Sequence, residues 1–136
     1  NGEKQIGMIK INIKKQSNYP ISSLNLKRKL TEFLTQKGLV SDTVVDVAIV
    51  GEKAMLNLAK EYLKEDNVLH NVLTFSEADV LGQFEYPNSK YGRLGEIVLC
   101  YKKVFDEARE ENKLIDEKAY ELIEHGARHL LGEHHE

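Results

Sequence analysis

Regular alternation of apolar and polar residues predicts the strands of this chain. Residues 9–13 place isoleucine at every second position, the period-two pattern of a strand with one solvent-facing side. The same pattern at residues 45–49 predicts a second strand, and residues 68–75 predict a third. Residues 94–100 are nearly all apolar, which favours a fourth strand in the middle of the sheet.

Apolar residues spaced three and four apart predict four amphipathic helices. The first spans residues 22–37 and ends at Gly38, and the second spans residues 52–64. The last two span residues 102–112 and 116–131. The residues expected to be buried on the second helix are Met55, Leu58, Ala59 and Tyr62.

These elements predict an α+β fold with a mixed four-stranded sheet and helices packed on it. At 136 residues, the chain fits one domain covering residues 1–136. Residues 76–93 contain no such periodicity and predict a long loop, a feature that is often functional. Residues 1–7 are polar and precede Met8, so we expect them to be a cloning remnant before the native start.

Composition indicates a cytoplasmic protein that does not span a membrane. The hydrophobic content is 41% and the charged content 30%, both ordinary for a globular protein, and no apolar run is long enough to span a bilayer. No signal peptide is recognisable. The single cysteine, Cys100, fits a reducing compartment. The oligomeric state is left open.

Four of the five histidines lie in the last twelve residues, and three of these have the spacing of metal ligands. His125 and His129 are four apart, so a helix places them on one face about 6 Å apart along its axis. Gly132 predicts the end of the helix, after which the chain can turn back and bring His135 towards the same ion. Three nitrogen ligands leave a position for water, as in catalytic zinc sites. His134 is the alternative third ligand.

The last helix is expected to hold the metal at the edge of the core. Successive 100° steps place His125 and His129 on one flank of an apolar stripe, which predicts a metal cleft beside this C-terminal helix. The stripe includes a glycine, whose missing side chain would let another backbone approach closely. The residues of the predicted stripe are Ile115, Ala119, Leu122, Gly126 and Leu130.

The spacing HxxxHxxGxxH also occurs in the metzincin proteases, but these carry glutamate directly after the first histidine as general base. Gly126 occupies that position here and cannot accept a proton from water. The motif therefore keeps the metal ligands without the peptidase's base, which indicates different chemistry at a similar site.

The histidine segment resembles the signature HGxLHLxGxDH of the YbeY family. Residues 71–75, NVLTF, are similar to the family's TDVLSF, and residues 95–99, GEIVL, are similar to its GDIV strand. The resemblance implies a metal-dependent single-strand endoribonuclease involved in ribosomal RNA processing and ribosome maturation. It implies zinc as the cofactor, and single-stranded RNA, ribosomal RNA and the ribosomal small subunit as partners. The implied metal ligands are His125, His129 and His135.

The resemblance also implies which residues contact the substrate. The family's arginine upstream of TDVLSF aligns with Lys64, and we expect Lys64 and Arg128 to act as catalytic residues by contacting phosphate. Lysine keeps the charge of arginine but lacks its bidentate geometry. Asn71 and Glu96 lie in the matching motifs and are candidates to orient ligands or water. The nucleophile is either metal-activated hydroxide or the RNA 2′-hydroxyl.

The net charge of −3 predicts local phosphate contacts rather than a broad basic groove. Two alternative functions stay open. One is a metal-dependent peptidase or other hydrolase, for which Glu133 is the only acid inside the motif. The other is a non-catalytic metal- and ribosome-binding protein.

Overall fold

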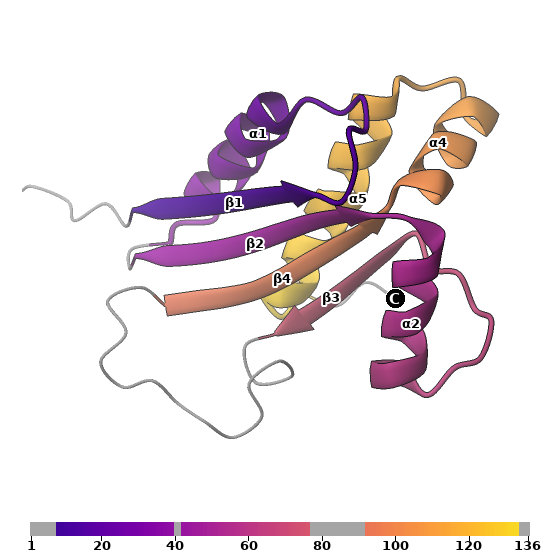
Figure 1. The fold of residues 1–136 in the computed structure, drawn as a ribbon. Helices are drawn as coiled ribbons and strands as arrows, with labels where there is room; N and C mark the ends of the chain where they lie inside the picture. Colours follow the sequence, from indigo (N-terminus) through magenta and orange to yellow (C-terminus); the bar gives the residue numbers. More distant parts are fainter. Residues whose placement is uncertain (1–7, 40–41, 77–91, 134–136) are drawn as a thin grey trace, which may run out of the picture.

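Four strands form one mixed sheet in the computed structural model, which describes residues 8–39, 42–76 and 92–133 (Figure 1). The strand order is β1-β2-β4-β3, with β1, β2 and β4 parallel and β3 antiparallel at one edge. The predicted mixed sheet is therefore confirmed, and so is the central position of the apolar fourth strand. The strands are β1 (Ile9–Lys15), β2 (Thr43–Val50), β3 (Val72–Ser76) and β4 (Gly92–Cys100).

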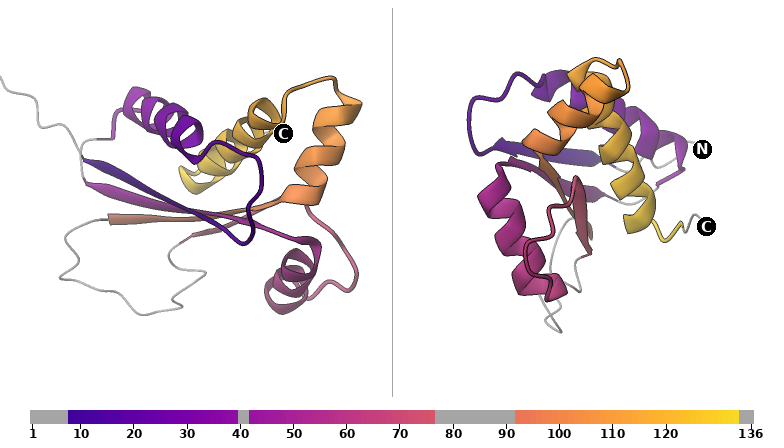
Figure 2. Two further views of the ribbon diagram at one scale, coloured as in Figure 1. Left: turned by 45° about the horizontal axis from the view of Figure 1, so that its top comes forward. Right: turned by 90° about the vertical axis from the view of Figure 1, so that its right-hand side faces the viewer.

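Helices cover both faces of this sheet. Figure 2 shows α1, α4 and α5 on one face and α2 on the other, which confirms the α+β class. None of the helices in the described ranges is both long and apolar enough to cross a membrane. The helices are α1 (Ser23–Gln36), α2 (Glu52–Leu63), α4 (Tyr101–Glu110) and α5 (Ile115–Leu130).

Strand alternation divides the apolar residues between two cores. Val47 and its alternate neighbours on β2 point towards α1 and α5 and belong to the larger core. On the opposite face, Met55 of α2 packs with Leu73 and Phe75 of β3 in a smaller core. Both faces of the central strands are thus covered, as expected for nearly continuous apolar strands.

Gly38 and Gly132 follow the ends of α1 and α5, as the sequence predicts. Gly38 and Gly132 have φ of 78° and 82°, the left-handed conformation that glycine adopts without steric cost. After α5, the Gly132 N–H donates to the His129 carbonyl at 3.0 Å and the Glu133 N–H donates to the Arg128 carbonyl at 2.9 Å. This is a Schellman motif, and it leaves the two histidine positions in the last two turns of α5.

Three local predictions differ from the structure. β3 begins at Val72 and not at residue 68, so His70 lies in the preceding loop with its Nε2 2.6 Å from Glu65 Oε1. Tyr62 is 47% exposed instead of buried, because it packs on the edge strand, where one side of its ring meets solvent. Ser76 and residues 92–93, which were expected in the long loop, belong to strands. The remainder of that loop, residues 77–91, lies outside the described residues.

Candidate active site

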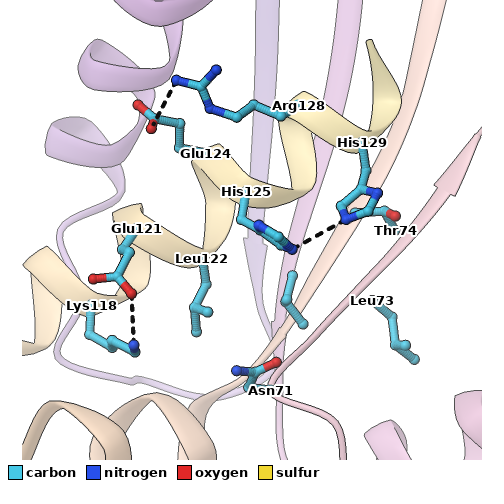
Figure 3. A pocket seen from close by; sticks show the side chains of 11 residues that line it. Asn71, Leu73, Thr74, Lys118, Glu121, Leu122, Glu124, His125, Arg128 and His129 are labelled. Carbon is cyan, nitrogen blue, oxygen red and sulfur yellow. Dashed lines mark hydrogen bonds and ion pairs between the residues drawn. The ribbon is translucent and has the colours of Figure 1, made fainter. Parts of the chain in front are cut away.

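A cleft of about 800 Å³ runs between α5 and β3, the edge strand of the sheet. His125 and His129 line it from the C-terminal half of α5, and Lys118 lines it from the N-terminal half (Figure 3). Asn71 and Thr74 form part of the opposite wall, at β3 and directly before it. The cleft therefore joins two of the three segments on which the family resemblance depends.

Close packing of α5 on the sheet depends on Gly126. A Cβ atom at this position would lie 2.8 Å from Cγ2 of Thr74 and 3.1 Å from Cγ2 of Ile97. The sequence predicted a close approach by another backbone, whereas side chains of β3 and β4 occupy this space. Because His125 directly precedes Gly126, this contact fixes how near the histidines lie to β3.

The imidazoles of His125 and His129 meet at the surface of this cleft. Their Nε2 atoms are 3.2 Å apart, and the two ring planes are inclined by 77°. Both residues are exposed, and Figure 3 shows both rings projecting from α5 towards β3. The i, i+4 spacing on one helix face thus brings two nitrogen ligands together.

This pair fits a tetrahedral metal ion. Zinc–nitrogen bonds of about 2.0–2.1 Å at a tetrahedral angle separate two ligand nitrogens by about 3.3–3.4 Å. The observed 3.2 Å is close to that distance. An ion between them requires both rings to carry hydrogen on Nδ1 and to present their Nε2 lone pairs. Imidazole ligands suit zinc among the common biological ions.

The third ligand cannot be placed in the same way. His135, and the alternative His134, lie outside the described residues. Within residues 8–39, 42–76 and 92–133, no three histidine, cysteine, aspartate or glutamate side chains are grouped to hold one ion. The complete three-histidine site therefore stays a prediction from the sequence.

The two expected phosphate contacts occupy different faces of the sheet. Arg128 is among the residues that line the cleft, but its guanidinium points away from the two histidines (Figure 3) and lies 3.1 Å from a Glu133 oxygen and 3.5 Å from a Glu124 oxygen. Its charge is therefore shared with two carboxylates. Lys64 follows α2 on the opposite side of the sheet, and its Nζ donates to the Glu61 carbonyl at 3.1 Å. The structure does not bring Lys64 to the histidine pair.

Glu133 is poorly suited to serve as the base of a peptidase. The Lys37 ammonium, 2.9 Å away, and the Arg128 guanidinium hold the pKa of the Glu133 carboxyl below its usual range. A general base that acts near neutral pH needs a raised carboxyl pKa instead. Glu133 is also absent from the lining of the cleft in the part of the chain that is described.

Glu96 also lies away from the histidines. Its neighbours Gly95 and Ile97 both face α5, because a Cβ atom on Gly95 would lie 2.8 Å from Leu130 Cδ2 and Ile97 is close to Gly126. Alternation along β4 directs Glu96 to the other face of the sheet. Of the two candidate orienting residues, only Asn71 lines the cleft.

A buried lysine is the feature of this cleft that the sequence did not reveal. Lys118 is only 5% exposed, and its Nζ lies 2.8 Å from a Glu121 oxygen, 2.9 Å from Glu111 and 3.5 Å from Glu107. Burial alone would favour the neutral amine, but hydrogen bonds to Glu121 and Glu111 hold the pKa of Lys118 above its usual value. The sequence feature that could have indicated its burial is its position beside apolar residues of the last helix.

This network reaches the opposite wall of the cleft. The Asn71 amide nitrogen lies 3.2 Å from both carboxylate oxygens of Glu107, which also pairs with Lys118. Because a carboxylate only accepts hydrogen bonds, these contacts place the amide nitrogen on the Glu107 side. The Asn71 oxygen then points towards the cleft (Figure 3). An acceptor is thus held opposite the histidine-bearing helix.

Comparisons with known proteins agree with this geometry. The family described as "Endoribonuclease YbeY" matches residues 10–136. An endoribonuclease YbeY of Francisella philomiragia is 26% identical over 132 residues, covering 93% of this chain and 78% of the relative. An endoribonuclease YbeY of Francisella tularensis subsp. holarctica is 27% identical over 133 residues, covering 94% of this chain and 77% of the relative.

A solved structure shares the fold. The solution structure of TM1509 from Thermotoga maritima is 28% identical, with a TM-score of 0.60, and the match covers 93% of this chain and 75% of that chain. The family match spans the histidine segment and both supporting motifs, so the resemblance inferred from those motifs is confirmed. The predicted class of enzyme, a hydrolase of the nuclease type, is confirmed with it. The chain belongs to the endoribonuclease YbeY family.

Proposed function

We propose that this protein is a zinc-dependent endoribonuclease that cuts single-stranded RNA in the cleft between α5 and β3. The observation that carries the proposal is the pair of imidazole nitrogens, 3.2 Å apart, in a chain that belongs to an endoribonuclease family. The pair has the spacing of zinc ligands, and both rings are exposed to the cleft, where a phosphate group can reach them.

The residues of the cleft suggest a division of roles. His125, His129 and His135 would hold the ion as neutral imidazoles. Bound zinc supplies Lewis acidity, which activates water near neutral pH and offsets negative charge on a reacting phosphate. Arg128 would contact phosphate by exchanging one of its carboxylate partners. The Asn71 oxygen would accept a hydrogen bond from a ribose hydroxyl or from water.

The charge of the cleft favours a small number of phosphate contacts. Glu121 and Glu124 line it beside Lys118 and Arg128, so its cations are largely neutralised by carboxylates. Affinity for RNA would therefore be modest, since a broad basic groove is not available in the described part of the cleft. This supports local recognition of an accessible single strand.

The natural substrate in this proposal is ribosomal RNA. The ribosomal small subunit is the proposed partner, and the cytoplasm is the proposed compartment. These assignments rest on the family resemblance, and the family's description as an endoribonuclease supports RNA as the substrate. Gly126 in the position of the protease base argues against peptide hydrolysis.

Cleavage assays test the proposal directly. Labelled single-stranded RNA, the same RNA in a duplex, and casein are incubated with the protein in zinc, in chelator, and after zinc is restored. We expect metal-dependent cutting of the single strand alone. His129→Ala should abolish it, and His70→Ala is the matched control, because His70 pairs with Glu65 outside the cleft.

Other outcomes would identify the alternatives. Metal-dependent degradation of casein with intact RNA would indicate a peptidase and refute the ribonuclease. Zinc binding without cleavage of either substrate would indicate a non-catalytic metal-binding protein.

A further inference from the structure

Three aromatic rings gather beside the carboxyl ends of the parallel strands, outside the histidine cleft. Tyr19, in the segment after β1, stacks on Tyr101 at the start of α4, with ring centroids 4.5 Å apart and planes inclined by 14°. Phe105 extends the group, its centroid 6.2 Å from that of Tyr101. Two segments that are distant in the sequence thus build one aromatic surface.

This aromatic surface borders a pocket. The pocket has a volume of about 410 Å³, within the range of roughly 300–1,000 Å³ typical of small-molecule sites. Phe105 is 37% exposed, whereas Phe33 and Phe75 are buried in the cores. At Gly51, which also lines the pocket, a Cβ atom would lie 3.3 Å from the Tyr19 hydroxyl. The missing side chain keeps space beside the rings.

The charge next to the rings favours an anion on one side of the pocket. The first turn of α4 contains Lys102 and Lys103 and no acidic residue. The positive end of a helix dipole attracts phosphate. Lys102 pairs with Asp106 at 3.2 Å, but both side chains are well exposed, so this pair is weak and can exchange. Glu52 disfavours phosphate on the α2 side.

We propose that Tyr19, Tyr101 and Phe105 form a stacking subsite for one unpaired base of RNA, with the adjoining phosphate beside Lys102. The inference rests on the proposed RNA substrate and adds a contact outside the histidine cleft. Planar rings bind any base through its π face, so the subsite would hold single strands without reading their sequence. A base paired in a duplex cannot present its face in this way.

Binding of a fluorescent oligouridylate, measured by anisotropy in chelator so that no cleavage occurs, tests the subsite. Phe105→Ala should raise Kd about 5- to 150-fold, which corresponds to losing about 1–3 kcal/mol of base stacking. Phe105→Leu keeps an apolar side chain but removes the ring face, and should also weaken binding. Tyr62→Ala is the matched control, since Tyr62 is an exposed aromatic residue on α2. Thermal melting verifies that each variant is folded.

An abasic oligonucleotide separates stacking from charge. Wild type and Phe105→Ala should bind it equally, because no base is left to stack. An unchanged Kd for Phe105→Ala and Phe105→Leu, or an equal loss for Tyr62→Ala, would overturn the subsite. Cleavage is measured separately, so a protein that binds RNA through Phe105 but cuts nothing would refute the proposed nuclease and leave the subsite standing.

Discussion

Replacing Gly126 with alanine tests whether the packing of α5 on the sheet is as tight as the structure shows. The added Cβ would lie 2.8 Å from Thr74 Cγ2 and 3.1 Å from Ile97 Cγ2. Both neighbours are β-branched side chains with restricted χ1 rotation, and Ile97 is fully buried. Neither can move aside freely, so α5 or β3 must shift.

Two opposing terms decide the size of the effect. Alanine in place of glycine inside a helix stabilises it by about 1 kcal/mol. Overpacking a tight core costs about 1–3 kcal/mol. Because one contact falls well below van der Waals distance, we expect the cost of overpacking to exceed the gain in helix stability by about 1 kcal/mol. For a chain of this length, that loss lowers Tm by about 4 °C.

Thermal and urea unfolding of Gly126→Ala, Thr74→Ser and the double variant provide the measurement. Thr74→Ser removes the methyl group nearest the new Cβ, so the double variant should recover about 1 kcal/mol relative to the sum of the single changes. Zinc affinity should change little, because both histidines stay on the same helix. A higher Tm for Gly126→Ala, or strict additivity in the double variant, would refute the close approach of α5 to β3.

Three further predictions follow from the site. If the third ligand is His135, His135→Ala should lower zinc affinity far more than His134→Ala does. Calorimetric titration measures both affinities, and the reverse order would identify His134 as the ligand. Lys118→Met should destabilise the fold by about 1–3 kcal/mol at neutral pH, because Glu107, Glu111 and Glu121 lose a shared cation and only Glu111 and Glu121 keep Lys113 as a partner. Hydrogen bonds from Lys118 and then Lys113 lower the pKa of Glu111, and hydrogen bonds from Lys113 and then Lys118 lower the pKa of Glu121, so their stabilising effect is present above about pH 4.5 and is lost as pH falls through the lower folded values. The deficit of Lys118→Met should shrink over the same range, and a deficit independent of pH would contradict the assignment. Arg128→Ala should reduce the rate of RNA cleavage and the dependence of that rate on salt. Lys64→Ala should cut RNA at nearly the wild-type rate, because Lys64 lies on the other side of the sheet. Loss of cleavage in Lys64→Ala alone would show that the substrate reaches that face.

The helices and strands could be predicted because their signals are local. Local structure is determined by the alternating isoleucines, the apolar stripes and the glycines at positions 38 and 132, each within a few residues of its own position. The structure contains the strands, helices and helix ends that these patterns predict. The pairing of His125 with His129 was predictable for the same reason, since it needs only one turn of helix. The exposure of Tyr62 depends on which strand lies at the edge, and periodicity contains no such information.

Features that depend on how distant elements meet were not predictable. Lys118 is buried because carboxylates from α4 and α5 surround it, and its place beside the apolar stripe of the last helix does not reveal those partners. Lys64 matches a motif position in sequence, but the order of the strands decides which face of the sheet it occupies. The motif that contains Glu96 likewise does not reveal the direction of its side chain.

Zinc binding by the untagged protein tests the central claim most directly. Metal analysis and zinc titration at neutral pH should give near-stoichiometric binding, because two imidazole nitrogens already converge at 3.2 Å. Protons compete for the same nitrogens, so affinity should fall in acid, where imidazole becomes protonated and can no longer bind the ion. His129→Ala should lose most of the affinity. A wild-type protein that takes up no zinc at neutral pH, or a His129→Ala variant that binds zinc as tightly as the wild type, would contradict the account.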